Sequence, residues 1–295
     1  RISRLKSLPI LFIGEGSNIV FTKDYDGLVI KNNIFGKIEH DERIVEISSG
    51  ENWHNFVDWS LSNEKYGLEN LALIPGTVGA SPIQNIGAYG KEVSEFIKEV
   101  KSINTLTAEE RVFSKEECKF GYRSSVFQNK KDYFITSVVF ETNQDPCIDI
   151  AYDSLHKFFK ASSKELKTLT PKDVFDGVSS LRRIILPDHN KEFNVGSFFK
   201  NLILEEADFR NLNEIIDVPY YKDNYKYKVP SGYLIEVAGW KGKGLKNVKV
   251  SEQHALVLTT NGNLDGNEIV RFADSIIDDI YNKFKVKLEI EPTLI

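Results

Sequence analysis

The sequence predicts an α+β protein of more than one domain, with a boundary near Pro187. Three observations lead to this prediction. The 295 residues exceed the length of one typical domain. Short apolar runs separated by glycine-rich turns occur beside amphipathic helical segments. The pattern also changes after Leu186 and Pro187, where a helical stretch gives way to mixed strand and helix signals.

In the N-terminal part, short apolar runs bounded by turns predict strands in residues 8–21, 27–32 and 37–50. The next segment, 51–65, predicts a helix, because Trp53, Phe56 and Val57 fall on one face. Strands with intervening turns are expected in three further segments: 92–107, 118–127 and 132–142.

Residues 154–187 are expected to form two helical pieces. Thr170 and Pro171 mark the second start, since proline suits the first helical position and Asp173 is favourable in the first turn. Beyond Pro187 we expect strand or strand-and-helix pieces at 194–204, 233–240 and 254–260. An amphipathic helix is expected at 266–284, and a final strand at 286–295.

Composition excludes several classes of protein. A net charge of −5 and a pI near 5.7 argue against a nucleic-acid partner. Only two cysteines, Cys118 and Cys147, indicate a reducing compartment without a disulfide framework. No apolar run is long enough to span a membrane, and no signal-peptide pattern is seen. These features together predict a cytoplasmic protein. The five histidines, including His54, lack metal-ligand spacing, so we expect no bound metal.

The first motif is GEGSN, which follows an apolar strand directly and comprises Gly14, Glu15, Gly16, Ser17 and Asn18. Two glycines allow a tight turn and let backbone N–H groups approach an anion. A dinucleotide fingerprint of the Rossmann type would need a third glycine where Ile19 stands, and a helix behind it. The motif is therefore either an ordinary hairpin turn or a phosphate cradle of another kind.

The second motif is PGTVGASPIQNIGAYG, residues 75–90, which contains no charged side chain. Small residues expose much of its backbone, and polar residues add hydrogen-bonding groups: Pro75, Gly76, Gly79, Ala80 and Gly87; Ser81, Gln84 and Asn85. A flexible surface loop is the alternative, but spaced apolar residues such as Ile74 and Val78 would anchor this one. Two such segments without lysine predict a dinucleotide held by backbone N–H groups.

These motifs, together with CKFGYRSS, VGSFFKN and ALVL, occur in one order over nearly the whole chain. The set resembles the UDP-N-acetylenolpyruvoylglucosamine reductase (MurB) family. The resemblance implies a two-part FAD-binding domain of the vanillyl-alcohol-oxidase type plus a separate α+β substrate domain. It implies FAD-binding subdomains at 1–52 and 53–186 and a substrate domain at 187–286, with a C-terminal strand, 287–295, that returns to the first subdomain.

The resemblance also implies chemistry. Such an enzyme reduces the enolpyruvyl ether of UDP-N-acetylglucosamine enolpyruvate to UDP-N-acetylmuramate, with noncovalent FAD and NADPH as cofactors, and we expect a monomer. Ser197 matches the proton donor, Arg123 the group that stabilises the enolate, and Glu291 the glutamate that assists proton transfer. From the residues alone, a serine that caps a turn after Gly196 is the favoured interpretation of Ser197, and Glu289 competes with Glu291.

Four residues fall where the family binds the UDP-sugar or nicotinamide: Tyr152, Asn201, Tyr221 and Lys228. A solvated loop is the alternative for Tyr221 and Lys228. Ile185 stands where the family often has lysine, so either Arg182 or Arg183 replaces that phosphate contact or the diphosphate site is weaker. Two other functions stay open, namely a flavin oxidase of the same superfamily and a sugar-nucleotide binding protein without activity.

Overall fold

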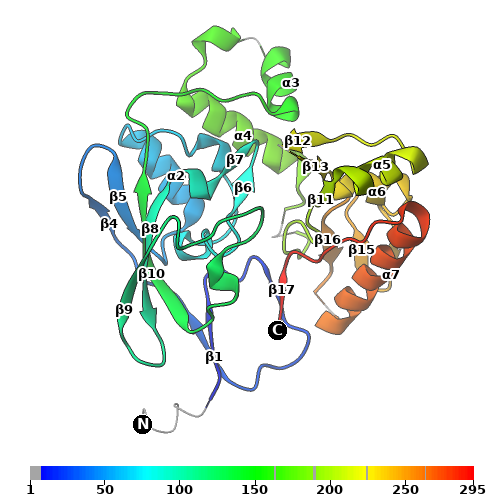
Figure 1. The fold of residues 1–295 in the computed structure, drawn as a ribbon, viewed down its shortest axis with the longest axis horizontal. Coiled ribbons are helices and arrows are strands. Elements are labelled where there is room, and N and C mark those ends of the chain that lie inside the picture. The colour runs from blue at the N-terminus through cyan, green and yellow to red at the C-terminus, as the bar shows by residue number, and fades with distance from the viewer. Residues whose placement is uncertain (1–7, 163, 189–190, 224, 263) are drawn as a thin grey trace. The chain divides into compact units, whose positions relative to one another are not determined.

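The computed structural model describes residues 8–162, 164–188, 191–223, 225–262 and 264–295. These residues form two compact units (Figure 1). Unit 1 contains the residues up to Ser17 and Asp26–Arg182, and unit 2 contains Asn18–Tyr25 and Arg183–Ile295. The three domain ranges given above from the resemblance remain a prediction.

The centre of unit 1 is an antiparallel five-stranded sheet in the order β4-β5-β10-β8-β9 (Figure 1). Its strands alternate buried and less buried residues, as expected when one face of a sheet is covered. Helix α2 packs on that face through Phe56, whose ring centroid lies 4.9 Å from that of Phe140. The strands are β4 (Lys37–Glu39), β5 (Ile44–Ser48), β8 (Ile97–Asn104), β9 (Glu110–Ser114) and β10 (Tyr133–Glu141).

Among the described residues of unit 1, α-helices and two small sheets complete the fold. Asn52 caps α2 by accepting a hydrogen bond from the Asn55 N–H. The helices are α2 (Trp53–Ser62), α3 (Asp153–Ala161) and α4 (Pro171–Ile185). The small sheets pair β1 (Ile10–Ile13) with β3 (Leu28–Lys31), and β6 (Gly87–Ala88) with β7 (Lys91–Glu92). Short 3₁₀ turns are η1 (Glu69–Leu71), η2 (Val78–Ala80), η3 (Val93–Glu95), η4 (Val126–Gln128) and η5 (Leu166–Thr168).

Unit 2 has its own core, built around helix α7, Gly266–Phe284. Asp265 caps this helix, and Lys285 ends it in the left-handed conformation. Three small sheets surround the helices: β11 (Leu202–Glu205), β13 (Lys226–Val229) and β12 (Tyr221–Asp223); β14 (Gly244–Leu245), β15 (Val248–Val250) and β16 (Leu258–Thr260); β17 (Thr293–Leu294) and β2 (Ile19–Val20). The other helices are α5 (Glu206–Ile215) and α6 (Ser231–Val237).

Several predicted elements need correction. Residues 118–127 form turns rather than strands, because Lys119 and Arg123 adopt positive φ angles that interrupt an extended chain. Residues 231–237 are the helix α6, and α5 follows β11 without having been predicted. Of the expected strand 286–295, only Thr293–Leu294 is a strand, paired in parallel with β2.

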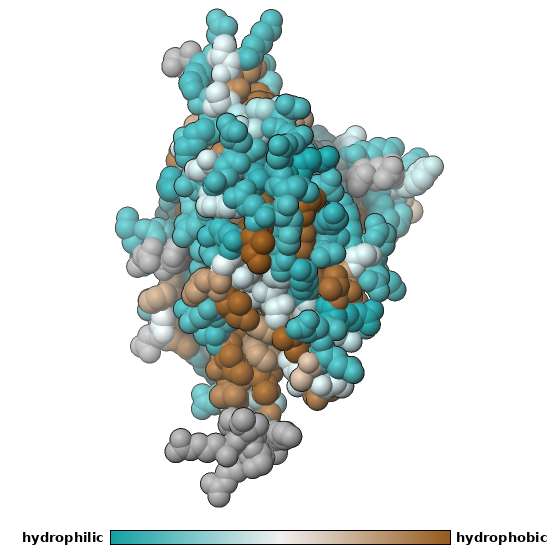
Figure 2. Space-filling model, turned by 90° about the vertical axis from the view of Figure 1, so that its left-hand side faces the viewer, coloured by the Kyte–Doolittle hydropathy of each residue, from teal (hydrophilic) through white to brown (hydrophobic). Residues whose placement is uncertain are grey.

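Exposed large apolar side chains of unit 1 occur repeatedly between residues 8 and 38, with Phe35 at 64% and Ile38 at 55% exposure. Figure 2 shows apolar side chains gathered in the lower half of one face. Among the described residues, no helix combines the length and the apolar character needed to cross a bilayer. The same residues contain no cluster of three or more histidine, cysteine or acidic side chains that could hold a metal ion.

Candidate active site

The two glycine-rich motifs lie against each other in unit 1. The Glu15 carboxylate joins them, since it accepts a hydrogen bond from the Gly76 N–H at 3.0 Å. Its other oxygen accepts from the Asn52 side chain at 2.7 Å. A Cβ atom on Gly14 would lie only 2.5 Å from the Thr77 hydroxyl oxygen, so the contact requires glycine. The structure therefore brings together two segments that are about sixty residues apart in sequence.

Gly16 is the most open point of this junction. Its φ of +72° favours glycine, and a Cβ atom built there would meet nothing within 4 Å. A left-handed glycine beside open space leaves its backbone accessible to a phosphate. This geometry fits the cradle predicted for residues 14–18.

Segment 75–90 is held much more tightly. The Gly79 N–H donates to the Ser49 carbonyl at 2.8 Å, and a Cβ atom there would lie 2.4 Å from the Ser49 Cβ. The prediction that backbone N–H groups of this segment hold a dinucleotide therefore does not extend to the Gly79 N–H, which is used within the protein; Gly79 is needed for close packing. The Ser81 hydroxyl donates to the Val78 carbonyl at 2.7 Å.

Asn85 also serves the protein rather than a ligand. It is fully buried, and its amide nitrogen donates to the Glu92 carboxylate at 2.7 Å and the Gly121 carbonyl at 3.0 Å. Its side-chain oxygen accepts from the Ser94 N–H at 3.0 Å. With these bonds made, Asn85 fixes the shape of the loop.

Arg123 is anchored to the same loop. Its guanidinium donates to the Gly87 carbonyl at 2.9 Å and more weakly to the Asn85 carbonyl at 3.4 Å. The φ of +48° at Arg123 reflects a constrained turn for a non-glycine residue. The structure thus places the predicted enolate-stabilising arginine directly beside residues 85–87.

A second arginine, Arg182 of α4, lies near Arg123. It donates from Nε to the Leu73 carbonyl at 3.1 Å. Burial lowers the pKa of Arg182, and the positive charge of Arg123 acts in the same direction. Two guanidinium groups that repel each other in a partly buried place favour binding of an anion between or beside them.

Tyr89 is the residue that sequence reasoning missed. It is 7% exposed, and its hydroxyl has no hydrogen-bond partner among the described residues. Burial raises its pKa, against the opposing charge of Arg182. Its ring packs edge-on against Tyr152, with centroids 5.4 Å apart. A buried phenol without a partner is a group that a bound ligand can satisfy. Tyr89 lies in the second glycine-rich motif, but the sequence does not show that its side chain is buried.

In unit 2, Ser197 and Glu291 lie on adjacent segments. The Glu291 N–H donates to the Phe198 carbonyl at 2.9 Å, and Ser197 forms an isolated bridge with Val257. The competing Glu289 is 72% exposed at its side chain and pairs with Lys200 at 3.2 Å. Glu291 is half-buried, so its environment suits a role beside Ser197 better.

The other predicted residues of unit 2 gather on one small sheet. Lys228 lies on the central strand β13 and pairs with Ile203 on one side and Tyr221 on the other. Residues directly opposite in antiparallel strands project to the same face. Asn201 precedes β11, and its side-chain oxygen accepts from the Ser231 N–H at 3.2 Å. This sheet can therefore present a cation and a phenol to one ligand.

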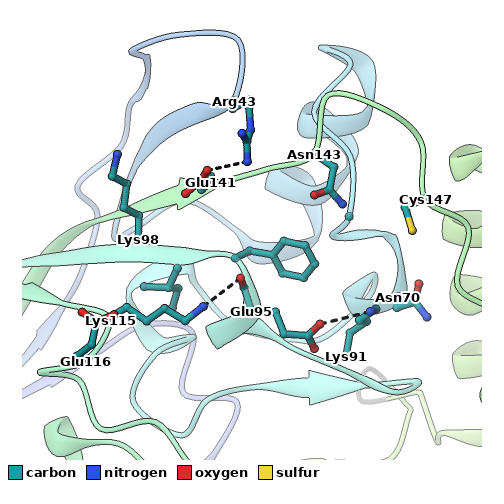
Figure 3. Close-up of a pocket in the computed structure, with 13 residues that line it drawn as sticks. Arg43, Asn70, Lys91, Glu95, Lys98, Lys115, Glu116, Glu141, Asn143 and Cys147 are labelled. Carbon is teal, nitrogen blue, oxygen red and sulfur yellow. Dashed lines mark hydrogen bonds and ion pairs between the residues drawn. The ribbon is translucent and has the colours of Figure 1, made fainter.

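A cavity of about 580 Å³ in unit 1 lies elsewhere (Figure 3). None of the predicted site residues lines it. Several of its charges pair within the protein: Arg43 with Glu141 at 2.6 Å, and Lys91 with Glu95 at 3.3 Å. We therefore do not assign it to the predicted chemistry.

Comparison with known proteins agrees with this arrangement. A family model described as an FAD binding domain matches residues 1–113, which contain both glycine-rich motifs. A second model, described as UDP-N-acetylenolpyruvoylglucosamine reductase, C-terminal domain, matches residues 188–295. The reductase of Burkholderia multivorans is 40% identical over 99% of this chain and 86% of its own length. The chain belongs to the UDP-N-acetylenolpyruvoylglucosamine reductase family.

Other members of the reductase family support the same placement. The Burkholderia pseudomallei reductase is also 40% identical to this chain. The crystal structure of the Thermus caldophilus enzyme (MurB) superposes with a TM-score of 0.65 at 18% identity, covering 99% of this chain and 88% of that one. The FAD-binding match covers Gly16 and Gly76, whereas Arg123, Tyr152 and Arg182 lie between the two matched regions.

Proposed function

We propose that this chain is an FAD-containing, NADPH-dependent oxidoreductase that reduces UDP-N-acetylglucosamine enolpyruvate to UDP-N-acetylmuramate, a precursor of peptidoglycan. The observation that carries the proposal is the backbone hydrogen bond from Glu291 to Phe198, which joins the segments of Glu291 and Ser197, because reduction of an enol ether needs a positioned proton donor. FAD supplies the hydride when it is bound.

We assign the cofactor site to the junction of residues 14–18 and 75–90. The bare backbone at Gly16 and the orphaned Tyr89 hydroxyl are the features that fit a bound nucleotide and flavin. Neither segment contains a histidine or cysteine, so attachment is noncovalent. In this scheme Gly79, Ser81 and Asn85 shape the loop through contacts with the protein.

We assign recognition of the substrate carboxylate to Arg123, supported by Arg182. A guanidinium can hold a carboxylate through two hydrogen bonds and stabilise negative charge that develops beside it. The Ser197 hydroxyl delivers a proton to the carbon next to the one that receives the hydride. Glu291 assists by moving a proton to or from Ser197.

We assign the UDP part of the substrate to Asn201, Tyr221 and Lys228 of unit 2, and Tyr152 is also assigned to substrate binding. A lysine and a phenol on one face of a sheet suit a diphosphate. The domain ranges 1–52, 53–186 and 187–286, the cytoplasmic location and the monomeric state belong to the same proposal.

The test separates the two half-reactions by stopped-flow flavin absorbance. The flavin of Ser197→Ala should be reduced by NADPH at the normal rate, because that step needs no proton from Ser197. Reoxidation by the enolpyruvyl substrate should slow by about 10²- to 10⁴-fold, the usual effect of losing one positioned acid. Ser197→Cys serves as the matched control and should keep more activity, since a thiol also donates a proton.

Each contrary outcome has a distinct meaning. Equal slowing of both half-reactions in Ser197→Ala would assign Ser197 to support of the fold, and unchanged reoxidation would remove it from the chemistry. Wild-type protein that is colourless would favour a binding protein. Protein that oxidises alcohols with oxygen but ignores the enolpyruvyl substrate would favour an oxidase.

A further inference from the structure

Leu73 occupies an unusual position just before segment 75–90. Its φ is +57°, in the left-handed region that a non-glycine residue seldom adopts. Such a conformation persists only where surrounding contacts enforce it, and these outliers cluster at functional sites. The contacts that enforce it come from two different helices.

One contact comes from the start of α2. The Leu73 N–H donates to Nδ1 of His54 at 3.1 Å. The neighbouring Trp53 donates from its indole to the Leu71 carbonyl at 2.8 Å and from its backbone to the Gly76 carbonyl at 3.0 Å. The first turn of α2 therefore fixes residues 71–76 at three points.

The other contact comes from α4, where Arg182 donates to the Leu73 carbonyl. Both hydrogen-bonding groups of the Leu73 backbone are thus used, one by His54 and one by Arg182. Leu73 connects the beginning of the cofactor loop to the arginine that lies near Arg123 and Tyr89. Any change in the Leu73 conformation would alter the position of the Arg182 guanidinium.

The orientation of the His54 ring is itself fixed. The ring stacks on Phe175 of α4, with centroids 5.0 Å apart and an angle of 7° between planes. Because Nδ1 accepts a hydrogen bond, the ring is neutral in this arrangement and carries its proton on Nε2. An imidazolium cannot accept that bond.

Charged side chains also lie near the stacked rings. From α4, the Lys172 ammonium lies 4.3 Å from the Phe175 ring centroid and pairs with Asp58 and Asp176 at 3.3 Å. Beyond Leu73, Arg182 adds a second positive charge. Both acids pair with Lys172 in this arrangement.

We propose that His54 is a positioning residue: as a neutral hydrogen-bond acceptor it holds Leu73 left-handed, and it thereby sets Arg182 and the start of the flavin loop. The inference rests on the proposed function for the role of Arg182. No contact of His54 with substrate or cofactor is required. The role explains why an imidazole, rather than another flat ring, stands at this point.

Two variants separate the acceptor from the ring. His54→Asn keeps a side-chain oxygen close to the place of Nδ1 but loses the stacked ring. His54→Phe keeps a flat ring against Phe175 but has no acceptor. His40→Asn is the control. His40 is an exposed histidine that contacts Glu46 and has no hydrogen bond with Leu73.

The first measurement is amide hydrogen exchange in the peptide that covers residues 71–77. Loss of one hydrogen bond should speed exchange about tenfold in His54→Phe. His54→Asn and His40→Asn should stay near the wild-type rate. Equal exchange in His54→Phe and wild type would overturn the proposal, as would equal acceleration in both His54 variants. This readout does not depend on the identity of the substrate.

The second measurement is the affinity for UDP-N-acetylglucosamine enolpyruvate, read from the flavin absorbance change. Affinity should fall about tenfold in His54→Phe and stay within about threefold in His54→Asn. Equal affinity in His54→Phe and wild type would overturn the assignment. Wild-type protein that fails to bind this substrate would instead contradict the proposed function.

Discussion

In residues 14–18 the backbone of Gly16 lies beside open space, whereas in residues 75–90 the backbone of Gly79 is packed against Ser49. Gly16 is required for its left-handed φ of +72°. Gly79 is required because a Cβ atom would lie 2.4 Å from the Ser49 Cβ. Two segments that look alike in composition thus use glycine for different physical reasons, conformation in one and close approach in the other.

The difference indicates which segment can adapt to a ligand. Ser49, on which Gly79 packs, is itself fully buried, and its N–H donates to the Thr136 carbonyl at 2.9 Å. Gly16 has no such neighbour within 4 Å. The second segment is therefore a rigid wall built on the sheet, and the first contributes accessible backbone.

The largest effect is expected for Gly79→Val. The added side chain meets backbone and Cβ atoms of a buried residue, which cannot move aside cheaply. We expect the free energy of unfolding to fall by about 3 kcal/mol, with loss of bound flavin as a consequence. Urea denaturation followed by the fluorescence of Trp53 and Trp59 measures this. A stable but colourless variant would show instead that Gly79 approaches the cofactor.

Gly16→Ala should lower the free energy of unfolding less than Gly79→Val does, and it should lower the FAD affinity selectively. The left-handed conformation costs alanine about 1 kcal/mol, and the open space tolerates the methyl group. If the cofactor approaches this backbone, FAD affinity should fall by about tenfold, read from flavin fluorescence quenching.

Gly239→Ala is the matched control for Gly16→Ala. Gly239 also has a positive φ, +82°, a Cβ atom there would meet only the Lys243 ammonium at 3.5 Å, and the residue lies outside both cofactor segments. It should lose similar stability and keep its FAD affinity. Parallel loss of affinity in both variants would assign the effect to backbone strain, and the comparison between the two segments would fail.

Sequence reasoning reached the motifs because their signals are local. The glycines of GEGSN and the uncharged run 75–90 are visible in one dimension, and so is the periodicity that predicted helix 266–284. The sequence did not decide between Glu289 and Glu291, since both would lie on one face of the strand expected at 286–295. Burial and the Lys200 ion pair, which depend on tertiary contacts, favour Glu291.

The errors have the same origin. Nothing local shows that the Gly79 N–H is taken by Ser49, thirty residues earlier, or that the Tyr89 hydroxyl is buried without a partner. Positive φ values at Arg123 and Leu73 are likewise imposed by long-range contacts, so propensity favours strand where the chain turns. The partners of the backbone, rather than residue types, carried the missing information.

The smallest effect concerns two carboxylates that each bind a glycine N–H, the exposed Glu15 beside the open segment and the buried Glu69 before the rigid one. Both Glu69 oxygens lie 2.9 Å from the Gly67 nitrogen, and the residue is 5% exposed. Burial raises the pKa of Glu69, while the Gly67 N–H and the charge of Lys91 oppose the rise.

The sign of the pH dependence follows from that direction. Because the pKa of Glu69 is higher in the folded state than its ordinary value of 4.5, the folded chain holds this proton more tightly than the unfolded chain. The stabilisation is complete below the unfolded pKa and is lost as pH rises through the folded pKa. Glu69→Gln, which does not titrate, removes this contribution. The unfolding free energy of the wild type minus that of Glu69→Gln should therefore decrease as pH rises above the ordinary carboxyl range, and then level off. Urea denaturation across this range measures it. An increase with pH would mean that the Gly67 hydrogen bond outweighs burial, and that the rigid segment tolerates a buried charge as readily as the open segment tolerates Glu15.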